Sequence, residues 1–327
     1  MLDVHLKDWQ KKALKDISRD MVKARHKSIS SNEDKGPVAA NNAMKTLRLL
    51  YNHAAKDNPG TLPENPVSVL SATKRWNKVK SRGTCIQESE LSVWYQAVDN
   101  LPNPIIRDAF KLLLFTGLRK NEAFGLKWAD VDFKQKMFTI VDPKNGNDLT
   151  LPMSTEIEKI LLERWNNRVN GFVFPGHGEK GHIVETRHMI EVIRIETCKS
   201  LNGITDDKTG EKLAALIKKN PGSVVPGIAF MPHDMRRTFG SIAENKISYT
   251  ELKRLLNHHE AKDVTQGYVI TSTDKLREPM QKITDAILAA IQASPEQPQQ
   301  QDAAHTKVIS INRRRRTEQA PLLLATN

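Results

Sequence analysis

The sequence predicts a mainly helical protein of two domains, with one small antiparallel β-sheet in the second. Its 327 residues exceed what one hydrophobic core usually supports. Apolar residues recur at spacings of three and four along most of the chain, which is typical of amphipathic helices. One stretch, FTIVDPKNGNDLTLP, has β-branched flanks around an Asn-Gly turn and predicts a hairpin. We therefore expect an all-helical domain over residues 1–83, a second domain over 84–292 and a disordered tail over 293–327.

Composition and charge narrow the class of protein. The net charge of +12 indicates a polyanionic partner, and residues 1–83 carry 17 Lys and Arg against 8 Asp and Glu. The chain lacks an apolar run long enough for a membrane span and an N-terminal secretory signal, so we expect a cytoplasmic protein without a membrane role. The two cysteines, Cys85 and Cys198, have no neighbours at metal-ligand spacing, so neither a zinc site nor a disulfide framework is expected.

The first domain is predicted to begin with helices that bear basic side chains. An apolar stripe that starts at Leu6 and reaches Met21 predicts one or two helices over residues 6–29. A second stripe, from Ala40 to Ala54, predicts a helix that ends near Pro59. Residues 58–83 contain three prolines and a run of Lys and Arg, so we expect a hinge there and a domain boundary near residue 83.

The second domain is predicted to be mostly helical around the hairpin. Helices are expected over residues 87–99 and 104–116, from Arg119, and from Thr155. Capping-box patterns are formed by Thr155 with Glu158 and by Ser248 with Glu251. The insertion over residues 201–226 suggests no residue-level function, and the run from Arg313 to Arg316 could contact DNA or only keep the tail solvated.

Three short motifs contain residue types suited to phosphate chemistry. Arg119 follows Gly117 at a junction between two helices, and His233 and Arg236 share a helix face because they are three residues apart. In LLNHHEAKDVTQGYV, His258 or His259 precedes Tyr268. Each motif alone is a weak signal, since a single arginine near a helix end is usually a surface or ion-pairing residue.

The ordered series of motifs resembles the tyrosine recombinase family, and in particular phage-type integrases. TGLRKNEAFGLKWADVDF, HDMRRTFG and LLNHHEAKDVTQGYV look like that family's blocks, with a lysine-bearing hairpin between the first two. The resemblance covers roughly residues 1–290, because the helix from Ala40 to Ala54 looks like part of the family's core-binding domain. It implies a helical core-binding domain followed by the recombinase catalytic fold. The small arm-binding domain of many phage integrases would precede this sequence, so we expect a truncated chain or a simpler subclass.

The resemblance also implies an activity and a role for each motif residue. The activity is site-specific cutting and rejoining of DNA through a covalent 3′-phosphotyrosine, which integrates or excises a mobile element or phage genome. Tyr268 would be the nucleophile, Arg119 and Arg236 would hold the phosphate, and Lys144 of the hairpin would protonate the leaving 5′ oxygen. His233 would be a general acid or base, His258 a hydrogen-bond donor to the phosphate, and Glu122 the support of Arg119. His259 remains an alternative to His258.

The other three tyrosines are weaker candidates for the nucleophile. Tyr51 and Tyr95 fall on amphipathic helices, where core packing is the better explanation. Tyr249 comes before the LNH block, too early in the chain.

The implied partners are double-stranded DNA with core-type sites, further copies of the chain in a tetramer on two DNA sites, and accessory DNA-bending proteins, with no metal or cofactor. The setting would be a bacterial cytoplasm, at the nucleoid. The apolar stripe from Leu276 to Ile291 predicts an amphipathic helix, which either packs on its own domain or, as the resemblance implies, docks on a neighbouring protomer. Residues expected to contact DNA are Lys23, Arg25, Lys45, Arg48, Lys74, Arg75, Lys78, Lys80 and Arg82.

Two other functions stay open at this point. A relaxing enzyme of the type IB topoisomerase kind shares the Arg, Lys, His and Tyr chemistry, although the integrase-like first domain argues against it. A non-catalytic DNA-binding regulator on the same scaffold would be favoured by loss of a catalytic residue, and the sequence shows none lost.

Overall fold

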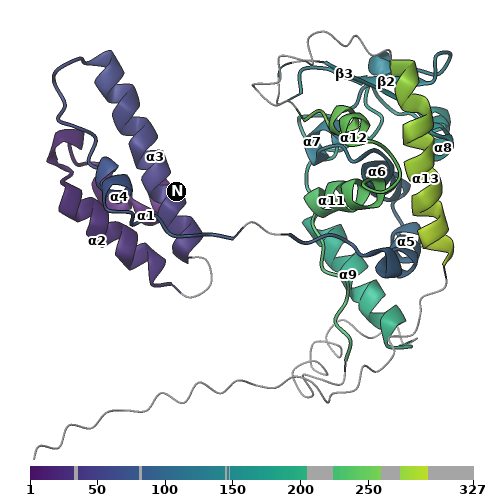
Figure 1. The fold of residues 1–327 in the computed structure, drawn as a ribbon, viewed down its shortest axis with the longest axis horizontal. Coiled ribbons are helices and arrows are strands. Elements are labelled where there is room, and N and C mark those ends of the chain that lie inside the picture. Colours follow the sequence, from purple (N-terminus) through teal and green to yellow (C-terminus); the bar gives the residue numbers. More distant parts are fainter. Residues whose placement is uncertain are drawn as a thin grey trace, which may run out of the picture. The chain divides into compact units, whose positions relative to one another are not determined.

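The computed structural model describes residues 1–32, 36–80, 83–143, 146, 148–204, 224–258 and 273–293. It forms two compact units, Met1–Gly83 and a second that begins at Thr84 (Figure 1). The described part is mainly helical with one three-stranded antiparallel sheet, which confirms the predicted fold class. None of its helices is long and apolar enough to cross a bilayer.

The first unit is a small helical bundle. Its core gathers side chains from the whole unit, among them Leu6, Val22, Met44 and Leu70. Its elements are α1 (Leu2–His5), two 3-10 turns (Lys7–Trp9 and Leu14–Asp16), α2 (Arg19–Ser30), α3 (Gly36–Asp57) and α4 (Ser68–Ala72).

The start of this unit differs from the prediction of one or two helices over residues 6–29. Ser18 is the N-cap of α2, and its hydroxyl accepts a hydrogen bond from the Met21 backbone N–H at 3.2 Å. A serine in this role fixes where a helix begins. The apolar residues before it therefore reach the core from short turns, and only residues from Arg19 onward are in the helix.

The predicted hinge over residues 58–83 is wrong for most of its length. Val67, Val69 and Leu70 are buried in the core of the first unit. The Tyr51 hydroxyl donates to the Pro63 carbonyl at 2.8 Å, and the Asn77 backbone N–H donates to Asn41 Oδ1 at 3.2 Å. Packing and hydrogen bonds thus fix the chain on the first unit as far as Asn77, in spite of its three prolines.

The second unit is built around α6 (Pro104–Thr116), whose nine buried residues include Phe110 and Phe115. It contacts α5, α7, α8, α11 and α13 (Figure 1). Asn103 caps its N-terminus, with Oδ1 accepting from the Ile105 N–H at 2.9 Å. The other helices are α5 (Leu91–Asp99), preceded by a 3-10 turn (Glu88–Glu90), then α7 (Lys120–Phe124), α8 (Thr155–Asn166), α9 (Arg187–Leu201), α11 (Pro232–Ala243), α12 (Tyr249–Leu255) and α13 (Arg277–Gln292).

The sheet comes after α7 in the sequence, and its strands β2 and β3 form the predicted hairpin. Strands β1 (Val131–Asp132), β2 (Met137–Ile140) and β3 (Leu149–Pro152) pair in sequence order. Phe138 lies opposite Leu151, and both are buried. The buried face of β2 and β3 fixes the register, because a slip of one residue would turn these side chains to solvent.

The capping-box prediction for α8 is wrong, and the structure distinguishes the two alternatives for α13. Ser154, not Thr155, is the N-cap of α8, so the Thr155 and Glu158 pair is no capping box, whereas the Ser248 and Glu251 box is confirmed. For α13, the structure agrees with the alternative that its apolar stripe packs on its own domain. Met280, Ile283 and Ile287 are buried in the core of their own unit, where α13 packs on α5, α6, α8 and α11.

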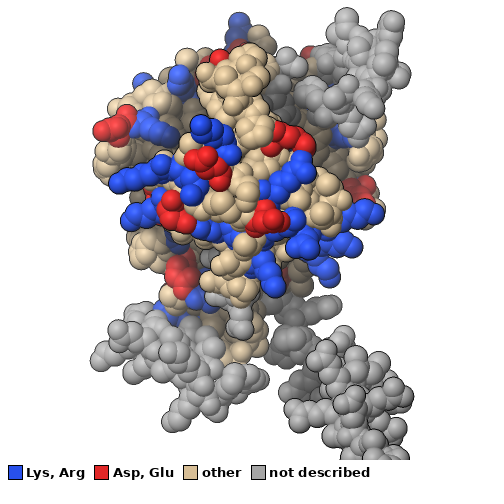
Figure 2. Space-filling view, turned by 90° about the vertical axis from the view of Figure 1, so that its left-hand side faces the viewer, with Lys and Arg blue, Asp and Glu red and all other residues tan. Residues whose placement is uncertain are grey.

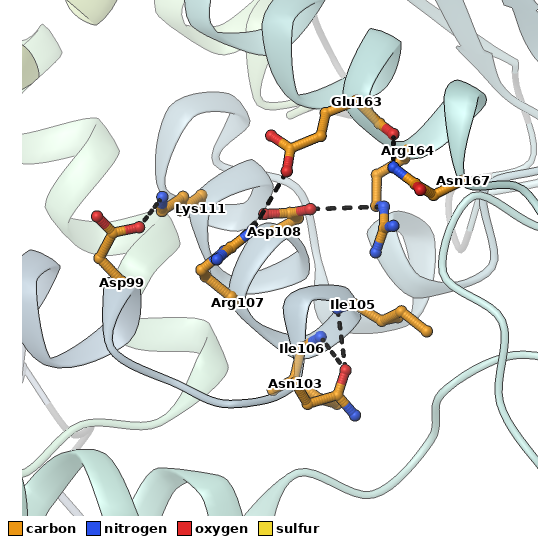
Figure 3. Close-up of polar contacts among 10 residues, drawn as sticks. All are labelled: Asp99, Asn103, Ile105, Ile106, Arg107, Asp108, Lys111, Glu163, Arg164 and Asn167. Atoms are coloured by element: carbon orange, nitrogen blue, oxygen red, sulfur yellow. Dashed lines mark hydrogen bonds and ion pairs between the residues drawn. The ribbon is translucent and has the colours of Figure 1, made fainter.

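A buried ion pair joins α6 to α8 (Figure 3). Asp108 and Arg164 are 2% and 5% exposed, and Arg164 Nε lies 3.4 Å from Asp108 Oδ2. Burial raises the pKa of Asp108, although the adjacent Arg107 guanidinium acts in the opposite direction. Both side chains of the pair are buried, so neither charge has ready access to water.

We expect Asp108→Ala to lower the free energy of unfolding by about 3 kcal/mol, because Arg164 then lacks its buried partner. The double variant Asp108→Leu/Arg164→Met should recover most of that loss, since the charge is removed together with its partner. Urea denaturation followed by circular dichroism measures both. Glu278→Ala breaks the exposed pair with Lys282 and is the control, expected to cost below about 0.5 kcal/mol. Equal losses in the single and double variants would contradict the ion-pair explanation.

Candidate active site

The site is built around the sharp end of α6 at Gly117. This residue adopts φ 62°, a left-handed conformation that favours glycine. A Cβ atom there would lie 2.7 Å from Phe239 Cδ1 and 2.9 Å from Leu256 Cδ2. Gly117 therefore lets α6, α11 and the end of α12 approach closely, and its carbonyl faces the side chains of α11.

Arg119 is fixed at the start of α7 by Glu122. The Glu122 carboxylate accepts from the Arg119 backbone N–H at 2.9 Å and from Arg119 Nη1 at 2.7 Å. Arg119 is the N-cap residue, and its side chain remains 27% exposed, whereas that of Glu122 is only 8% exposed. The carboxylate thus holds the guanidinium in place and leaves part of it open to solvent.

Arg236 lies in the interior, on the middle of α11, and is 5% exposed. Its Nη1 donates to the Gly117 carbonyl at 2.8 Å, and its Nη2 donates to the Leu256 carbonyl. Burial and the nearby charge of Arg119 lower the pKa of Arg236 to about 10, so it stays cationic at neutral pH. Among the described residues, its hydrogen-bond partners are backbone carbonyls and not carboxylates.

His233 and His258 approach these arginines from two elements. His233 is in the first turn of α11, and His258 follows α12, where its backbone N–H donates to the Lys253 carbonyl at 2.9 Å. Both side chains are exposed in the isolated chain. Partial burial and then nearby positive charges, including those of Arg236 and Arg119, lower both pKa values. Both imidazoles are therefore neutral near pH 7.

A groove of about 720 Å³ extends the site from Arg119 towards the hairpin. Lys120, Lys127, Thr139 and Pro143 are among the residues that line it. Basic side chains at Arg119, Lys120 and Lys127 meet acidic ones at Asp130 and Asp142 along its walls. The groove is open, apolar side chains such as Leu126 and Ile140 share its lining with the charged ones, and Pro143, the residue before Lys144, belongs to its wall.

The structure thus brings together Arg119, Glu122, His233, Arg236 and His258. Lys144 and Tyr268 lie outside the described residues, as does the alternative His259. Tyr51 is 1% exposed, as expected of a core tyrosine. Within the described residues no group of His, Cys, Asp and Glu side chains has the arrangement of a metal site.

The basic residues expected to contact DNA fall into two groups. Arg25 bonds to Asp8 and lies over the Trp9 ring, Lys23 pairs with Asp20, and Arg48 donates to Ser71 Oγ at 3.0 Å. The others are exposed, without an ion pair in the described part of the chain: Lys45, Lys74, Arg75, Lys78 and Lys80. Arg82 lies outside the described residues. Contact with DNA stays a prediction for all nine.

Figure 2 shows one face of the molecule, turned by 90° about the vertical axis from the view of Figure 1. Lys and Arg side chains spread over this face, with Asp and Glu between them. The positive charge is thus mixed with acidic side chains, which agrees with the ion pairs of Lys23 and Arg25. The free cations after α4 are the stronger candidates for phosphate contacts, because they need not give up a partner.

Sequence reasoning missed the carbonyl partners of Arg236 and the side chains that hold the start of α11. Asp234 is 4% exposed and accepts from the Met231 backbone N–H at 2.9 Å. The sequence does contain a helix-start signal here, because Pro232 is the first helical residue and Asp234 is an acidic residue in the first turn. The bonds to Gly117 and Leu256 involve backbone carbonyls, for which a sequence carries no signal.

Comparisons with known proteins identify the family of the chain. The sequence model described as the phage integrase family matches residues 85–274. Prophage integrase IntF of Escherichia coli K12 is 25% identical over 268 residues, 80% of this chain and 52% of that protein. Tyrosine recombinase XerA of Pyrococcus horikoshii is 27% identical over 208 residues, 62% of each protein. The chain therefore spans between half and two thirds of the length of these relatives.

Solved structures share the fold. A lambda integrase tetramer bound to a Holliday junction superposes with a TM-score of 0.55 at 17% identity, over 79% of this chain and 69% of that one. A Tn1549 transposon integrase in complex with a circular intermediate DNA gives 0.51 at 16% identity, over 84% and 89%. Since the family model covers more than half of the sequence, this chain belongs to the phage integrase family.

Proposed function

We propose that the chain is a site-specific tyrosine recombinase, which cuts and rejoins DNA through a covalent bond between Tyr268 and a 3′ phosphate. Its substrate would be double-stranded DNA with core-type sites on a phage genome or other mobile element. It would act as a tetramer on two sites, with DNA-bending accessory proteins, in the cytoplasm of a bacterial host. The family match and the geometry around Arg236 support this proposal.

The observation that carries the proposal is a surplus of positive charge in a partly enclosed site. Arg119 and Arg236 lie near enough for the charge of one to lower the pKa of the other, and only one carboxylate, Glu122, is close among the described residues. An arginine is rarely buried without a partner of opposite charge, because an uncompensated buried charge is costly. The unmatched charge suits a phosphate, whose non-bridging oxygens accept hydrogen bonds from guanidinium groups.

The proposed reaction is a displacement at phosphorus. The Tyr268 oxygen forms a bond to phosphorus as the bond to the 5′ oxygen breaks, and Lys144 gives its proton to that oxygen. A tyrosine hydroxyl has a pKa of about 10, so it needs a base, and His233, neutral at pH 7, is suited to take its proton. The two guanidinium groups and His258 stabilise the charge that develops on the phosphate oxygens. Reversal with a new 5′ hydroxyl rejoins the strand, and the phosphodiester energy is retained.

The proposal is tested with a duplex that carries a candidate core site and a nick, so that the released 5′ segment diffuses away and the adduct accumulates. Without added metal, the wild-type chain should give a protein-DNA band on a denaturing gel, and Tyr268→Phe should give none. Tyr249→Phe is the matched control, because Tyr249 is 70% exposed at the start of α12. It should form adduct at the wild-type level.

An adduct in Tyr268→Phe would show that another residue is the nucleophile and would contradict the proposal. Tight binding of the site without adduct in the wild-type chain would favour a non-catalytic regulator. Relaxation of supercoiled plasmid without exchange between two sites would favour the topoisomerase alternative.

The choice between His258 and His259 is a separate prediction. His258→Gln should lower the single-turnover cleavage rate by roughly 100-fold, the usual cost of losing one hydrogen-bond donor to a developing negative charge. His259→Gln should leave the rate close to that of the wild-type chain, since the pKa of His258 already responds to Arg236 and Arg119. Quench-flow or manual time courses on the nicked duplex give both rates. The reverse order would assign the role to His259.

A further inference from the structure

The chain enters the second unit along the helix that carries His233 and Arg236. Thr84 follows Gly83, the last residue of the first unit. The Ile86 backbone N–H donates to Thr238 Oγ1 at 2.8 Å, and the Thr238 hydroxyl donates to the Ile86 carbonyl at 3.1 Å. Thr238 is fully buried. The segment from Thr84 to Ile86 is therefore bonded to α11, about 150 residues away in the sequence.

The buried carboxylate of Asp234 bonds both to the start of α11 and to the segment that enters the second unit. Asp234 Oδ2 accepts from the Met231 backbone N–H at 2.9 Å and caps α11. Its Oδ1 accepts from the Thr84 hydroxyl at 2.9 Å and from Arg237 Nη1 at 2.6 Å. Arg237 Nη1 also lies 3.4 Å from the Thr84 carbonyl. Capping α11 needs only Oδ2, so the bonds made by Oδ1 require a different explanation.

The position of this contact on α11 gives that explanation. Asp234 lies between His233 and Arg236 in the sequence, and a helix turn moves as one body. A displacement at Thr84 would therefore shift both side chains relative to Arg119 and His258, which belong to other elements. Errors of about 1 Å in such groups can slow a reaction strongly.

We infer that Thr84 and Asp234 are positioning residues, which couple the exit of the interdomain segment to the catalytic helix α11. DNA held by the first unit would then set the pose of His233 and Arg236 through the Thr84 hydroxyl. This inference rests on the proposed function and adds a route by which site binding controls cleavage.

The charges around His233 agree with the inference. After burial, the Arg237 guanidinium is the largest cause of the lowered pKa of His233, followed by Arg236, with Asp234 opposing and Arg119 adding a smaller effect. His258 also faces this group, since the charge of His233 acts on its pKa. Arg237 is bonded to both Asp234 and Thr84, so the same contact that orients α11 also places the charge beside His233.

The test compares Thr84→Val with Thr84→Ser in the full chain. Valine keeps the shape of threonine and removes the hydroxyl, whereas serine keeps the hydroxyl. Thr155→Val is the matched control, because the Thr155 hydroxyl bonds to Gln281 on α13, at 3.1 Å, and not to α11. Three quantities are measured for each: the melting temperature, the affinity for an intact core-site duplex, and the single-turnover rate of adduct formation on the nicked duplex.

Thr84→Val should slow adduct formation by about fivefold, in line with one lost hydrogen bond, at unchanged DNA affinity. Thr84→Ser and Thr155→Val should react at the wild-type rate. A Thr84→Val rate equal to that of the wild-type chain, or an equal loss in Thr155→Val, overturns the inference while the proposed function stands. If the wild-type chain forms no adduct at all, the proposed function fails first.

Discussion

The burial of Arg236 is the constraint on which the rest of the site depends. A cation removed from water is costly unless other groups replace its hydration. Here the carbonyls of Gly117 and Leu256 do so, and within the described residues no carboxylate does. Carbonyl oxygens stabilise the guanidinium without cancelling its charge. The left-handed turn at Gly117, its close packing on Phe239 and the end of α12 are all needed to bring those two carbonyls to one side chain.

Helix α11 links this constraint to the remainder of the unit. One face buries Met235, Phe239 and Ile242 in the core around α6. Its first turn carries His233, and its polar residues receive the segment that enters from the first unit. Core packing, two of the proposed catalytic residues and the interdomain connection therefore all involve the same short helix. A fold arranged in this way can make the reactivity of the proposed phosphate site depend on how the first unit is held, without a separate regulatory element.

The sequence predicted the parts of the site that rest on local spacing. His233 and Arg236 are three residues apart, and the periodicity of residues 104–116 matches α6. The pairing of Arg119 with Glu122 was implied by the family resemblance. The sequence did not predict the features that depend on contacts between distant residues. Residues 64–77 pack on the first unit, and α13 packs on its own unit. In both cases a stripe of apolar residues indicates that one face is buried, but it does not indicate which other apolar surface covers that face. The Thr84 contact with Asp234 joins residues 150 positions apart.

The central claim is that DNA cleavage at this charge-rich site proceeds through a covalent bond between one tyrosine and a DNA phosphate. Mass spectrometry of the trapped adduct tests it most directly, after nuclease treatment has reduced the DNA to a short remnant and trypsin has cut the chain. We predict that the remnant is carried by the peptide Asp263–Lys275, in which Tyr268 is the sole tyrosine. A remnant on the peptide that contains Tyr249, or on a residue other than tyrosine, would contradict the account.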